Sequence, residues 1–345
     1  MSVGLSAPAF GALSDLLKSR SGLLIGPDKL YLLETRLGPI LRREGIPDLA
    51  ALARRLGGPG AEPLAQEVVE AMTTNESLFF RDSKPFDHFR AHVLPRLTEA
   101  RPAAAPLRLW SAAASTGQEA YSLAMILADN HVVVGQRKVE ILGTDLARGP
   151  LARAREALYS QFEVQRGLPV QMLLKHFRKE ADGWRLGAAL RAAVEFREWN
   201  LLADLRPLGT FDVVFCRNVL IYFDQPTKIR VLEAIARQMA PDGVLYLGGA
   251  ETALGLTDRL RPLPELPGGY VASMGPLPGV QDREIEAPSP AARSGVKSRH
   301  GSQQEAPTWP AATGSRSSPV MASARRPSQS QSRCSMPPLP GSTSV

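Results

Sequence analysis

The sequence predicts an α/β protein in which a doubly wound, mostly parallel sheet follows an all-α N-terminal region. Helical periodicity alone fills residues 10–97, whereas strand and helix patterns alternate over residues 107–247. Within the second region, residues 211–216 form a nearly continuous apolar run, as expected for a parallel strand covered on both faces. This alternation is typical of a doubly wound sheet.

Composition and charge narrow the class of protein. With 345 residues, 44% of them hydrophobic, the chain is long enough for two folded units. We expect no membrane span and no export signal. Cys216 and Cys334 are too few for a disulfide framework or a metal site, which fits a reducing cytoplasm. Residues from 276 onward carry eight Lys/Arg and four Asp/Glu, so +4 of the net +7 lies there, in a Ser/Pro-rich segment that we expect to be solvated rather than to bind nucleic acid.

The N-terminal region reads as amphipathic helices over residues 10–56, 63–72 and 85–97. The helix that begins near residue 30 carries four basic side chains, Lys29, Arg36, Arg42 and Arg43. They indicate either a solvated face or a docking surface for an acidic partner helix.

Residues 73–81, TTNESLFFR, join two of these helices. The two phenylalanines favour burial, while the neighbouring Asn, Ser and Arg side chains need polar partners. One interpretation is a buried, hydrogen-bonded site. The other is a helix junction with both phenylalanines in the core.

A β-loop-α-β pattern begins at residue 107, where a short strand leads through five small residues, 111–115, into an amphipathic helix. Thr116 and Glu119 have the spacing of a capping box at the start of that helix. Residues 139–144 form the next strand, and Asp145 stands at its carboxyl end, where an acid can bind ribose hydroxyls. The alternatives are that Glu119 is a plain capping acid and that Asp145 is an ordinary strand-end acid.

The loop of this unit indicates which nucleoside cofactor fits. Dinucleotide folds use G-x-G-x-x-G so that the backbone approaches a pyrophosphate, whereas Gly117 is the sole glycine of residues 112–117. A cofactor with phosphates is therefore disfavoured. S-adenosylmethionine has ribose and adenine but carries a sulfonium and an amino-acid end, which fits a loop of small residues with the Glu119 carboxylate close by.

Helical patterns return over residues 147–178, and a turn at residues 181–183 before Trp184 predicts a small hairpin inserted in the sheet domain. A strand over residues 194–199 leads to Asn200 and Leu201.

The apolar strand over residues 211–216 leads to Arg217, Asn218 and Tyr222. These side chains stand at the carboxyl edge, where open α/β sheets bind ligands. A helix over residues 225–239 and, after a turn, a strand over 244–247 complete the alternation.

Five segments stand in a characteristic order: TTNESLFFR, WSAAASTGQEAYSLAM, GTDL, EWNLL and FDVVFCRNVLIYFD. Together they resemble the signature of the chemotaxis-receptor methyltransferase family, CheR, over residues 10–275. Its members methylate glutamate side chains on receptor signalling helices. The resemblance implies a class I, Rossmann-like methyltransferase fold. It also implies that S-adenosylmethionine is the methyl donor and that the products are S-adenosylhomocysteine and glutamate 5-O-methyl esters on methyl-accepting chemotaxis receptors.

The resemblance also implies a domain organisation. We expect a receptor-facing helical domain over residues 1–100 and a methyltransferase domain over residues 101–275 with a flap at about residues 177–196. We expect residues 276–345 to be a disordered tail. The implied protein is a monomer of the cytoplasm that visits membrane receptor arrays without inserting into the membrane.

Roles carry over to matching residues. Asn75, Ser77 and Arg81 match the segment that touches the cofactor and faces the methyl-transfer site. Glu119 matches the acid that binds the amino-acid end of S-adenosylmethionine, and Asp145 matches the ribose-binding acid.

Asn200 and Leu201 match residues that flank the adenine, and Arg217, Asn218 and Tyr222 match the strand-edge group near the cofactor. The catalytic candidates are Arg81, which would orient the substrate carboxylate, and Tyr222, which would pack beside the methyl group.

The sequence departs from the family at three positions: Ser77 replaces a frequent threonine, Gln118 a glutamate and Ala120 a proline. Ser77 keeps the hydroxyl, and the other two positions flank Glu119 without replacing it, so we expect activity to survive. A glutamate carboxylate, with an ordinary pKa of roughly 4.3, is already ionised at neutral pH, so the reaction needs no general base. No metal is expected either.

The hairpin around Trp184 is short and holds one glycine, whereas in some family members a glycine-rich loop there grips a peptide at the receptor C-terminus. We therefore expect no recognition of such a peptide. Two other functions remain open: a methyltransferase of the same fold that acts on a small molecule, and a non-catalytic scaffold that senses S-adenosylmethionine.

Overall fold

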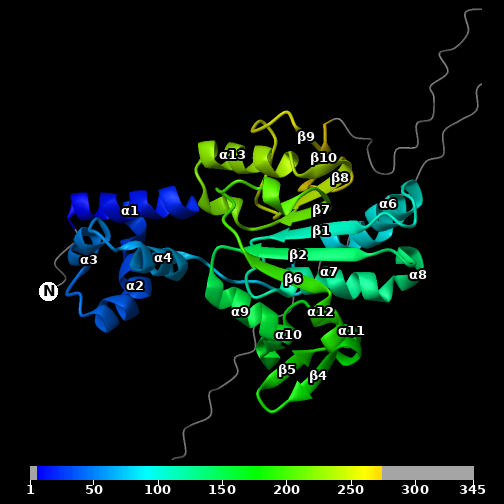
Figure 1. Cartoon of the computed structure of the whole chain (residues 1–345), viewed down its shortest axis with the longest axis horizontal. Helices are drawn as coiled ribbons and strands as arrows, with labels where there is room; N and C mark the ends of the chain where they lie inside the picture. The colour runs from blue at the N-terminus through cyan, green and yellow to red at the C-terminus, as the bar shows by residue number, and fades with distance from the viewer. Residues whose placement is uncertain (1–5, 274–345) are drawn as a thin grey trace, which may run out of the picture. The chain divides into compact units, whose positions relative to one another are not determined.

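A computed structural model describes residues 6–273, and Figure 1 gives the arrangement of their helices and strands. The expected disordered tail, residues 276–345, lies outside the described residues. No helix within residues 6–273 is both long and apolar enough to cross a membrane.

The N-terminal region is built of helices, as predicted, with an irregular segment over residues 73–83 between α4 and α5. Its elements are α1 (Ala7–Ser21), the short 3-10 turn η1 (Pro27–Lys29), α2 (Leu30–Glu44), α3 (Leu49–Leu56), α4 (Glu62–Met72), α5 (Lys84–His88), the π-helical turn η2 (Phe89–Val93) and α6 (Leu94–Ala100). Helices α1 to α4 enclose a separate apolar cluster built on Leu17, Leu33, Leu37 and Leu52, each fully buried. The apolar faces of these amphipathic helices therefore form the core of this helical unit.

The main sheet has seven strands in the order β6-β2-β1-β7-β8-β10-β9. The strands are β1 (Leu107–Ala112), β2 (Val139–Asp145), β6 (Val194–Glu198), β7 (Phe211–Cys216), β8 (Met239–Leu247), β9 (Leu260–Pro262) and β10 (Gly269–Ala272). The neighbours from β6 to β8 are parallel, and β10 pairs antiparallel with both β8 and β9. The predicted doubly wound, mostly parallel sheet is confirmed, and the antiparallel edge is an addition to it.

Helices cover both faces of this sheet (Figure 1). On β7, Val213 and Phe215 belong to one buried cluster, whereas Val214 and Cys216 belong to another. Successive strand residues point to opposite faces, so the apolar run reflects burial on both sides. The first cluster packs against α7 (Gln118–Asp129), and the second packs against α13 (Gln225–Ala236).

The remaining elements connect these strands. They are α8 (His131–Val134), α9 (Arg148–Glu156), β3 (Leu158–Tyr159), α10 (Gln161–Gln165), α11 (Val170–His176), β4 (Phe177–Glu180), β5 (Gly183–Leu186), α12 (Ala188–Ala192), and the 3-10 turns η3 (Arg206–Leu208) and η4 (Leu220–Tyr222).

The predicted hairpin is present as β4 and β5, but it belongs to a three-stranded sheet in the order β3-β5-β4. The helical patterns expected over residues 147–178 are present as α9, α10 and α11, but β3 interrupts them and β4 already begins at Phe177. The buried Tyr159 of β3 donates a hydrogen bond from its hydroxyl to the main-chain oxygen of Thr116, at 2.8 Å. This contact ties the small sheet to the loop that precedes α7.

The boundary between α13 and β8 also differs from the prediction. The helix ends at Ala236 rather than at residue 239, and β8 already begins at Met239, opposite Phe211. The predicted turn at residues 241–243 lies within β8, where the pairing with β7 is irregular.

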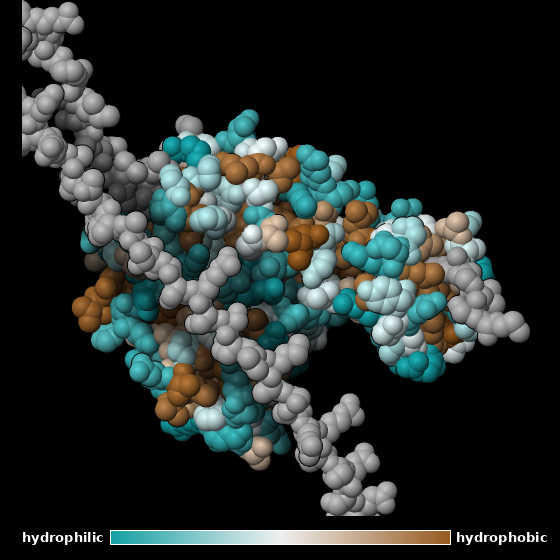
Figure 2. Space-filling view, turned by 180° about the vertical axis from the view of Figure 1, so that it is seen from behind, coloured by the Kyte–Doolittle hydropathy of each residue, from teal (hydrophilic) through white to brown (hydrophobic). Residues whose placement is uncertain are grey.

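On the face seen in Figure 2, hydrophobic residues form separate patches on a largely hydrophilic surface. The exposed apolar residues of α10 and α11 are Phe162, Val170 and Leu174.

Candidate functional site

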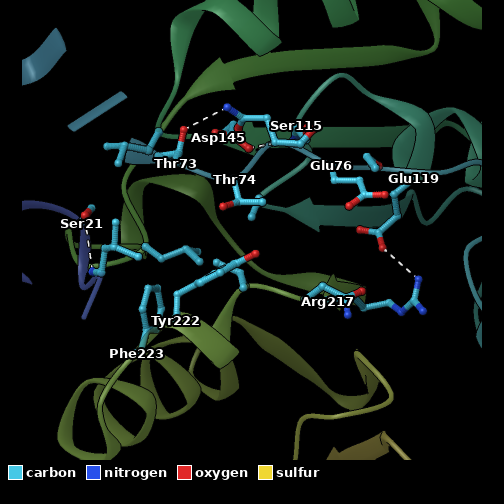
Figure 3. Close-up of a pocket in the computed structure, with 18 of the residues that line it drawn as sticks. Ser21, Thr73, Thr74, Glu76, Ser115, Glu119, Asp145, Arg217, Tyr222 and Phe223 are labelled. Carbon is cyan, nitrogen blue, oxygen red and sulfur yellow. Dashed lines mark hydrogen bonds and ion pairs between the residues drawn. The ribbon is translucent and has the colours of Figure 1, made fainter. Parts of the chain in front are cut away.

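A pocket opens at the carboxyl edge of the main sheet, where β1, β2 and β7 end (Figure 3). The hollow that its lining residues surround measures about 990 Å³ with the open solvent at its mouth included. All the candidate residues line it: Asn75, Ser77, Arg81, Glu119, Asp145, Asn200, Leu201, Arg217, Asn218 and Tyr222. The structure therefore gathers residues that lie up to 147 positions apart in the chain into one site.

Asp145 ends β2 and is 7% exposed. Its carboxylate accepts hydrogen bonds from the backbone N–H groups of Ser115, at 2.8 Å, and Ala147, at 2.9 Å. Burial raises the pKa of this carboxyl, and the backbone donors oppose that shift. The N–H bonds fix the side chain, and the remaining lone pairs of the carboxylate are available to hydroxyl donors.

Glu119 stands at the start of α7, but the predicted capping box is wrong. The cap position is Gly117, at φ 91°, and it makes no side-chain cap bond. A Cβ at Gly117 would meet the Cβ of Ala154 at 2.9 Å, so this tight, left-handed turn requires glycine. The Thr116 hydroxyl instead donates a hydrogen bond to the side-chain oxygen of Gln118, so the Glu119 carboxylate takes no part in capping the helix.

The Glu119 carboxylate accepts a 2.8 Å hydrogen bond from the Ser111 hydroxyl and lies 3.4 Å from the Arg217 guanidinium (Figure 3). Burial raises the pKa of Glu119, against the opposing effects of Arg217 and Ser111. A buried carboxylate in this setting gains from a cationic ligand, which would offset its loss of hydration.

Arg217 is not a free cation. Its side chain is 2% exposed and pairs with Asp82 at 2.6 Å as well as with Glu119. Asp82 belongs to a turn in which Phe80, Asp82 and Ser83 all have positive φ, of 48°, 62° and 34°. Three such residues in four positions cost backbone energy, and the Asp82–Arg217 pair helps to hold the turn against the sheet.

The segment over residues 73–81 satisfies both interpretations in part. Phe79 is fully buried and packs edge-on against Tyr159, whereas Phe80 is only partly buried. Asn75, Ser77 and Arg81 line the pocket. The segment is thus a core anchor and a polar pocket wall at once.

Helix α2 holds this wall through Arg36. Its guanidinium donates hydrogen bonds to the main-chain oxygens of Met72, at 2.6 Å, and Thr73, at 2.9 Å, and to the hydroxyl of Thr74, at 3.1 Å. Among the basic residues of α2, Arg36 is therefore part of the fold, neither simply solvated nor free for a partner. Arg43 pairs with Glu67 on α4.

The other wall of the pocket joins α1 to the sheet. The amide group of Asn200 donates a 2.5 Å hydrogen bond to the main-chain oxygen of Arg20, and the backbone N–H of Leu24 donates one of 2.9 Å to the carbonyl of Tyr222. Leu201 is buried among the residues packed under α13. These contacts bring Ser21 and Leu23 into the pocket lining.

Sequence reasoning missed several lining residues, among them Ser21, Leu23, Thr74, Glu76, Ser115, Trp199, Val219 and Phe223. Ser115 had a usable signal, because it lies in the small-residue loop before α7. Ser21 and Leu23 had none, since tertiary contacts alone bring them to the sheet.

The pocket has features that S-adenosylmethionine would satisfy. The side-chain oxygen of Asn218 is buried and has no hydrogen-bond partner, which is rare for such an atom. The carboxylates of Glu119 and Asp145 suit an ammonium group and ribose hydroxyls, respectively. Within residues 6–273, no cluster of three or more His, Cys, Asp or Glu side chains could hold a metal ion. The residues present fit a cationic nucleoside ligand.

A parallel sheet with an acid at the end of β2, a second acid on α7 and a loop without the phosphate-binding glycines is typical of S-adenosylmethionine-dependent methyltransferases. Comparison with known proteins agrees. Residues 8–73 match the all-alpha domain of CheR methyltransferases, and residues 75–265 match their S-adenosylmethionine-binding domain. This chain belongs to the CheR methyltransferase family.

Curated relatives cover most of the described chain. Chemotaxis protein methyltransferase Cher2 of Pseudomonas putida is 38% identical over 256 residues, which span 73% of this chain and 93% of that protein. Chemotaxis protein methyltransferase 1 of Pseudomonas aeruginosa is 40% identical, with the same two shares. Chemotaxis protein methyltransferase of Vibrio parahaemolyticus is 36% identical over 71% of this chain and 90% of its own length.

Proposed function

We propose that this protein transfers a methyl group from S-adenosylmethionine to glutamate side chains of methyl-accepting chemotaxis receptors, giving glutamate 5-O-methyl esters. The observation that carries the proposal is Arg81. Arg81 lines the same pocket as Glu119 and Asp145 and makes no ion pair within residues 6–273, although, after Arg166, it helps to lower the pKa of the Glu76 carboxyl. Its one hydrogen bond there runs to the main-chain oxygen of Glu76, at 3.5 Å. A cation so placed is suited to an incoming carboxylate.

The residues of the pocket would divide the binding of the cofactor among them. Asp145 would accept the ribose hydroxyls, and Glu119 would accept the ammonium of the amino-acid end. Asn200 and Leu201 would flank the adenine, and Asn75, Ser77, Arg217 and Asn218 would complete the wall. When bound, S-adenosylmethionine supplies an electrophilic methyl group.

The chemistry asks the protein for alignment rather than for proton transfer. The glutamate nucleophile is already ionised at neutral pH. Arg81 would orient that carboxylate, and Tyr222 would pack beside the methyl group and exclude water. Correct placement of two reactants can supply on the order of 7–11 kcal/mol of the barrier reduction.

We propose that the protein acts in the cytoplasm as a monomer and binds receptor arrays transiently. It would neither insert into the membrane nor bind nucleic acid.

The proposed domain limits are a helical domain over residues 1–100 and a methyltransferase domain over residues 101–275 that includes the flap at residues 177–196. The short β4–β5 hairpin supports the proposal that no receptor C-terminal peptide is bound. Measurable binding of such a pentapeptide would contradict it.

Transfer of radiolabelled methyl from S-adenosylmethionine to membranes that contain the chemoreceptors tests the function. We expect label on a receptor-sized protein and its release as volatile methanol in mild alkali, which identifies a methyl ester. Asp145→Ala serves as the inactive control. Absence of label from a protein that binds S-adenosylhomocysteine would favour a small-molecule acceptor or a cofactor-sensing scaffold instead.

A further inference from the structure

Glu251 follows β8 and is only 9% exposed, and its buried carboxylate accepts four backbone hydrogen bonds. One carboxylate oxygen accepts the N–H groups of Val219, at 2.8 Å, and Ile221, at 3.3 Å. The other accepts those of Asn218, at 2.8 Å, and Gly248, at 2.6 Å. A single side chain therefore satisfies donors at the carboxyl ends of two adjacent parallel strands, β7 and β8.

The donors after β7 belong to a segment that lines the pocket. That segment supplies Arg217, Asn218, Val219, Tyr222 and Phe223 to the lining, while Glu251 itself does not reach it. Glu251 lines instead a second hollow on the other side of the segment, next to Ile221 and Leu254. The carboxylate thus supports the pocket wall from behind.

The backbone at this point needs such support. Asn218 has φ 58°, in the left-handed region, which asparagine adopts more readily than most residues with a side chain. A Cβ at Gly248 would lie 2.7 Å from the Glu251 carboxylate and 2.9 Å from the backbone nitrogen of Asn218. The two chain segments therefore approach as closely as glycine permits. The side-chain oxygen of this same residue is buried and has no hydrogen-bond partner among residues 6–273.

We propose that Glu251 is a positioning residue of the methyl-transfer site: it holds residues 218–222 so that Asn218 and Tyr222 face the bound cofactor. The inference rests on the pocket binding S-adenosylmethionine and not on which acceptor is methylated. Its test therefore uses S-adenosylhomocysteine binding, which does not depend on the receptor.

Glu251→Gln is the informative variant. Each oxygen of the carboxylate accepts two N–H groups, so either orientation of the amide places a donor against two donors. Loss of the charge alone would act through space and would add to the effect of a change at Asn218, whereas loss of the backbone contacts would not. The double-mutant cycle below separates the two.

The control is Glu233→Gln. Glu233 lies on α13, accepts hydrogen bonds from Thr257 and Arg237, and does not line the pocket. Calorimetry with S-adenosylhomocysteine on the full chain should give binding at least tenfold weaker for Glu251→Gln and within about twofold of the parent for Glu233→Gln. Binding by a folded Glu251→Gln variant that equals the parent's would overturn the proposal.

A double-mutant cycle separates positioning from general destabilisation. Asn218→Ala should weaken binding, and adding it to Glu251→Gln should weaken binding little further, because both changes remove the same contact with the ligand. Fully additive losses would mean that Glu251 acts elsewhere, and would overturn the role assigned to it.

Hydrogen exchange on the unaltered protein gives a second test if Glu251→Gln does not fold. The amides of Asn218, Val219 and Ile221 should exchange slowly although they lie outside the regular strands, and should slow further with S-adenosylhomocysteine. Rapid exchange of these amides in both states would contradict the proposal. Failure of receptor methylation with these results intact would count against the proposed substrate alone.

Discussion

The pocket has two walls that are built in different ways. The sheet wall presents Glu119 and Asp145, both largely buried and fixed by Ser111 or by backbone N–H groups. The helical wall presents residues 73–81, whose first residues are held to α2 by the hydrogen bonds of Arg36. A wall with buried, oriented acceptors is suited to affinity, whereas a wall with partly exposed polar side chains is suited to aligning a second substrate.

The largest effect should come from the sheet wall. Asp145→Asn keeps the size of the side chain but places an amide N–H against the N–H of Ser115 or of Ala147. Hydrogen bonds to charged groups are worth about 1.5–3 kcal/mol each, so we expect binding of S-adenosylhomocysteine to weaken about 100-fold in calorimetry. A folded variant with less than a threefold change would remove Asp145 from the binding site.

A change in the helical wall should lower the rate of methyl transfer more than the affinity for the cofactor. Arg81→Ala should lower kcat for receptor methylation about 30-fold and change S-adenosylhomocysteine affinity by less than about threefold, because Arg81 is proposed to orient the acceptor. Steady-state kinetics and calorimetry on the same preparation check this. Equal losses in both would assign Arg81 to cofactor binding, and Arg81→Lys should recover part of kcat by restoring the charge.

The same division explains how far the sequence alone could lead. Asp145 and Arg217 were predictable because strand ends in a parallel sheet meet at one edge, and strands are read from apolar runs. The capping box of Thr116 and Glu119 was wrong because a left-handed turn at Gly117, set by packing against Ala154, moved the helix start. The spacing of two residues carries no information on such a tertiary clash.

The parts that the sequence could not predict are those that depend on distant segments. Glu251 follows β8 by a few residues, and its signal is one acid in a glycine-rich turn. Gly248 of that turn supplies one of its four donors, but the other three come from residues 218–221. Arg36 resembled the other basic residues of α2 until its acceptors at residues 72–74 were known. The spacing of charges along α2 does not distinguish Arg36, which holds residues 72–74, from the exposed Arg42.

Acidic pH should lower the affinity of the sheet wall for S-adenosylhomocysteine. Burial raises the pKa of both Glu119 and Asp145, so these groups take up protons at a higher pH than ordinary carboxyls, which titrate near roughly 4. Binding needs them ionised, and affinity should therefore fall several-fold as pH is lowered from 8 to 5. Calorimetry with S-adenosylhomocysteine measures it.

The control for this titration is Glu119→Gln. Its affinity should be lower at pH 8 and should depend less on pH, since Asp145 alone would still titrate. A parent protein whose affinity stays constant down to pH 5 would show that neither carboxylate needs its charge for binding.

The smallest effect should come from the tether of the helical wall. Arg36→Ala leaves the carbonyls of Met72 and Thr73 and the hydroxyl of Thr74 without their donor. We expect a loss of about 1–2 kcal/mol in the free energy of unfolding and only a twofold to threefold change in S-adenosylhomocysteine affinity. Urea unfolding and calorimetry give the two numbers.

Arg42→Ala is the matched control, because Arg42 is an exposed arginine of the same helix. It should leave both quantities unchanged. If Arg36→Ala instead weakened binding as strongly as Asp145→Asn, the two walls would not differ in kind. The helical wall would then have to be counted with the sheet as a rigid part of the cofactor site, and the alignment of the acceptor would have to depend on another part of the protein.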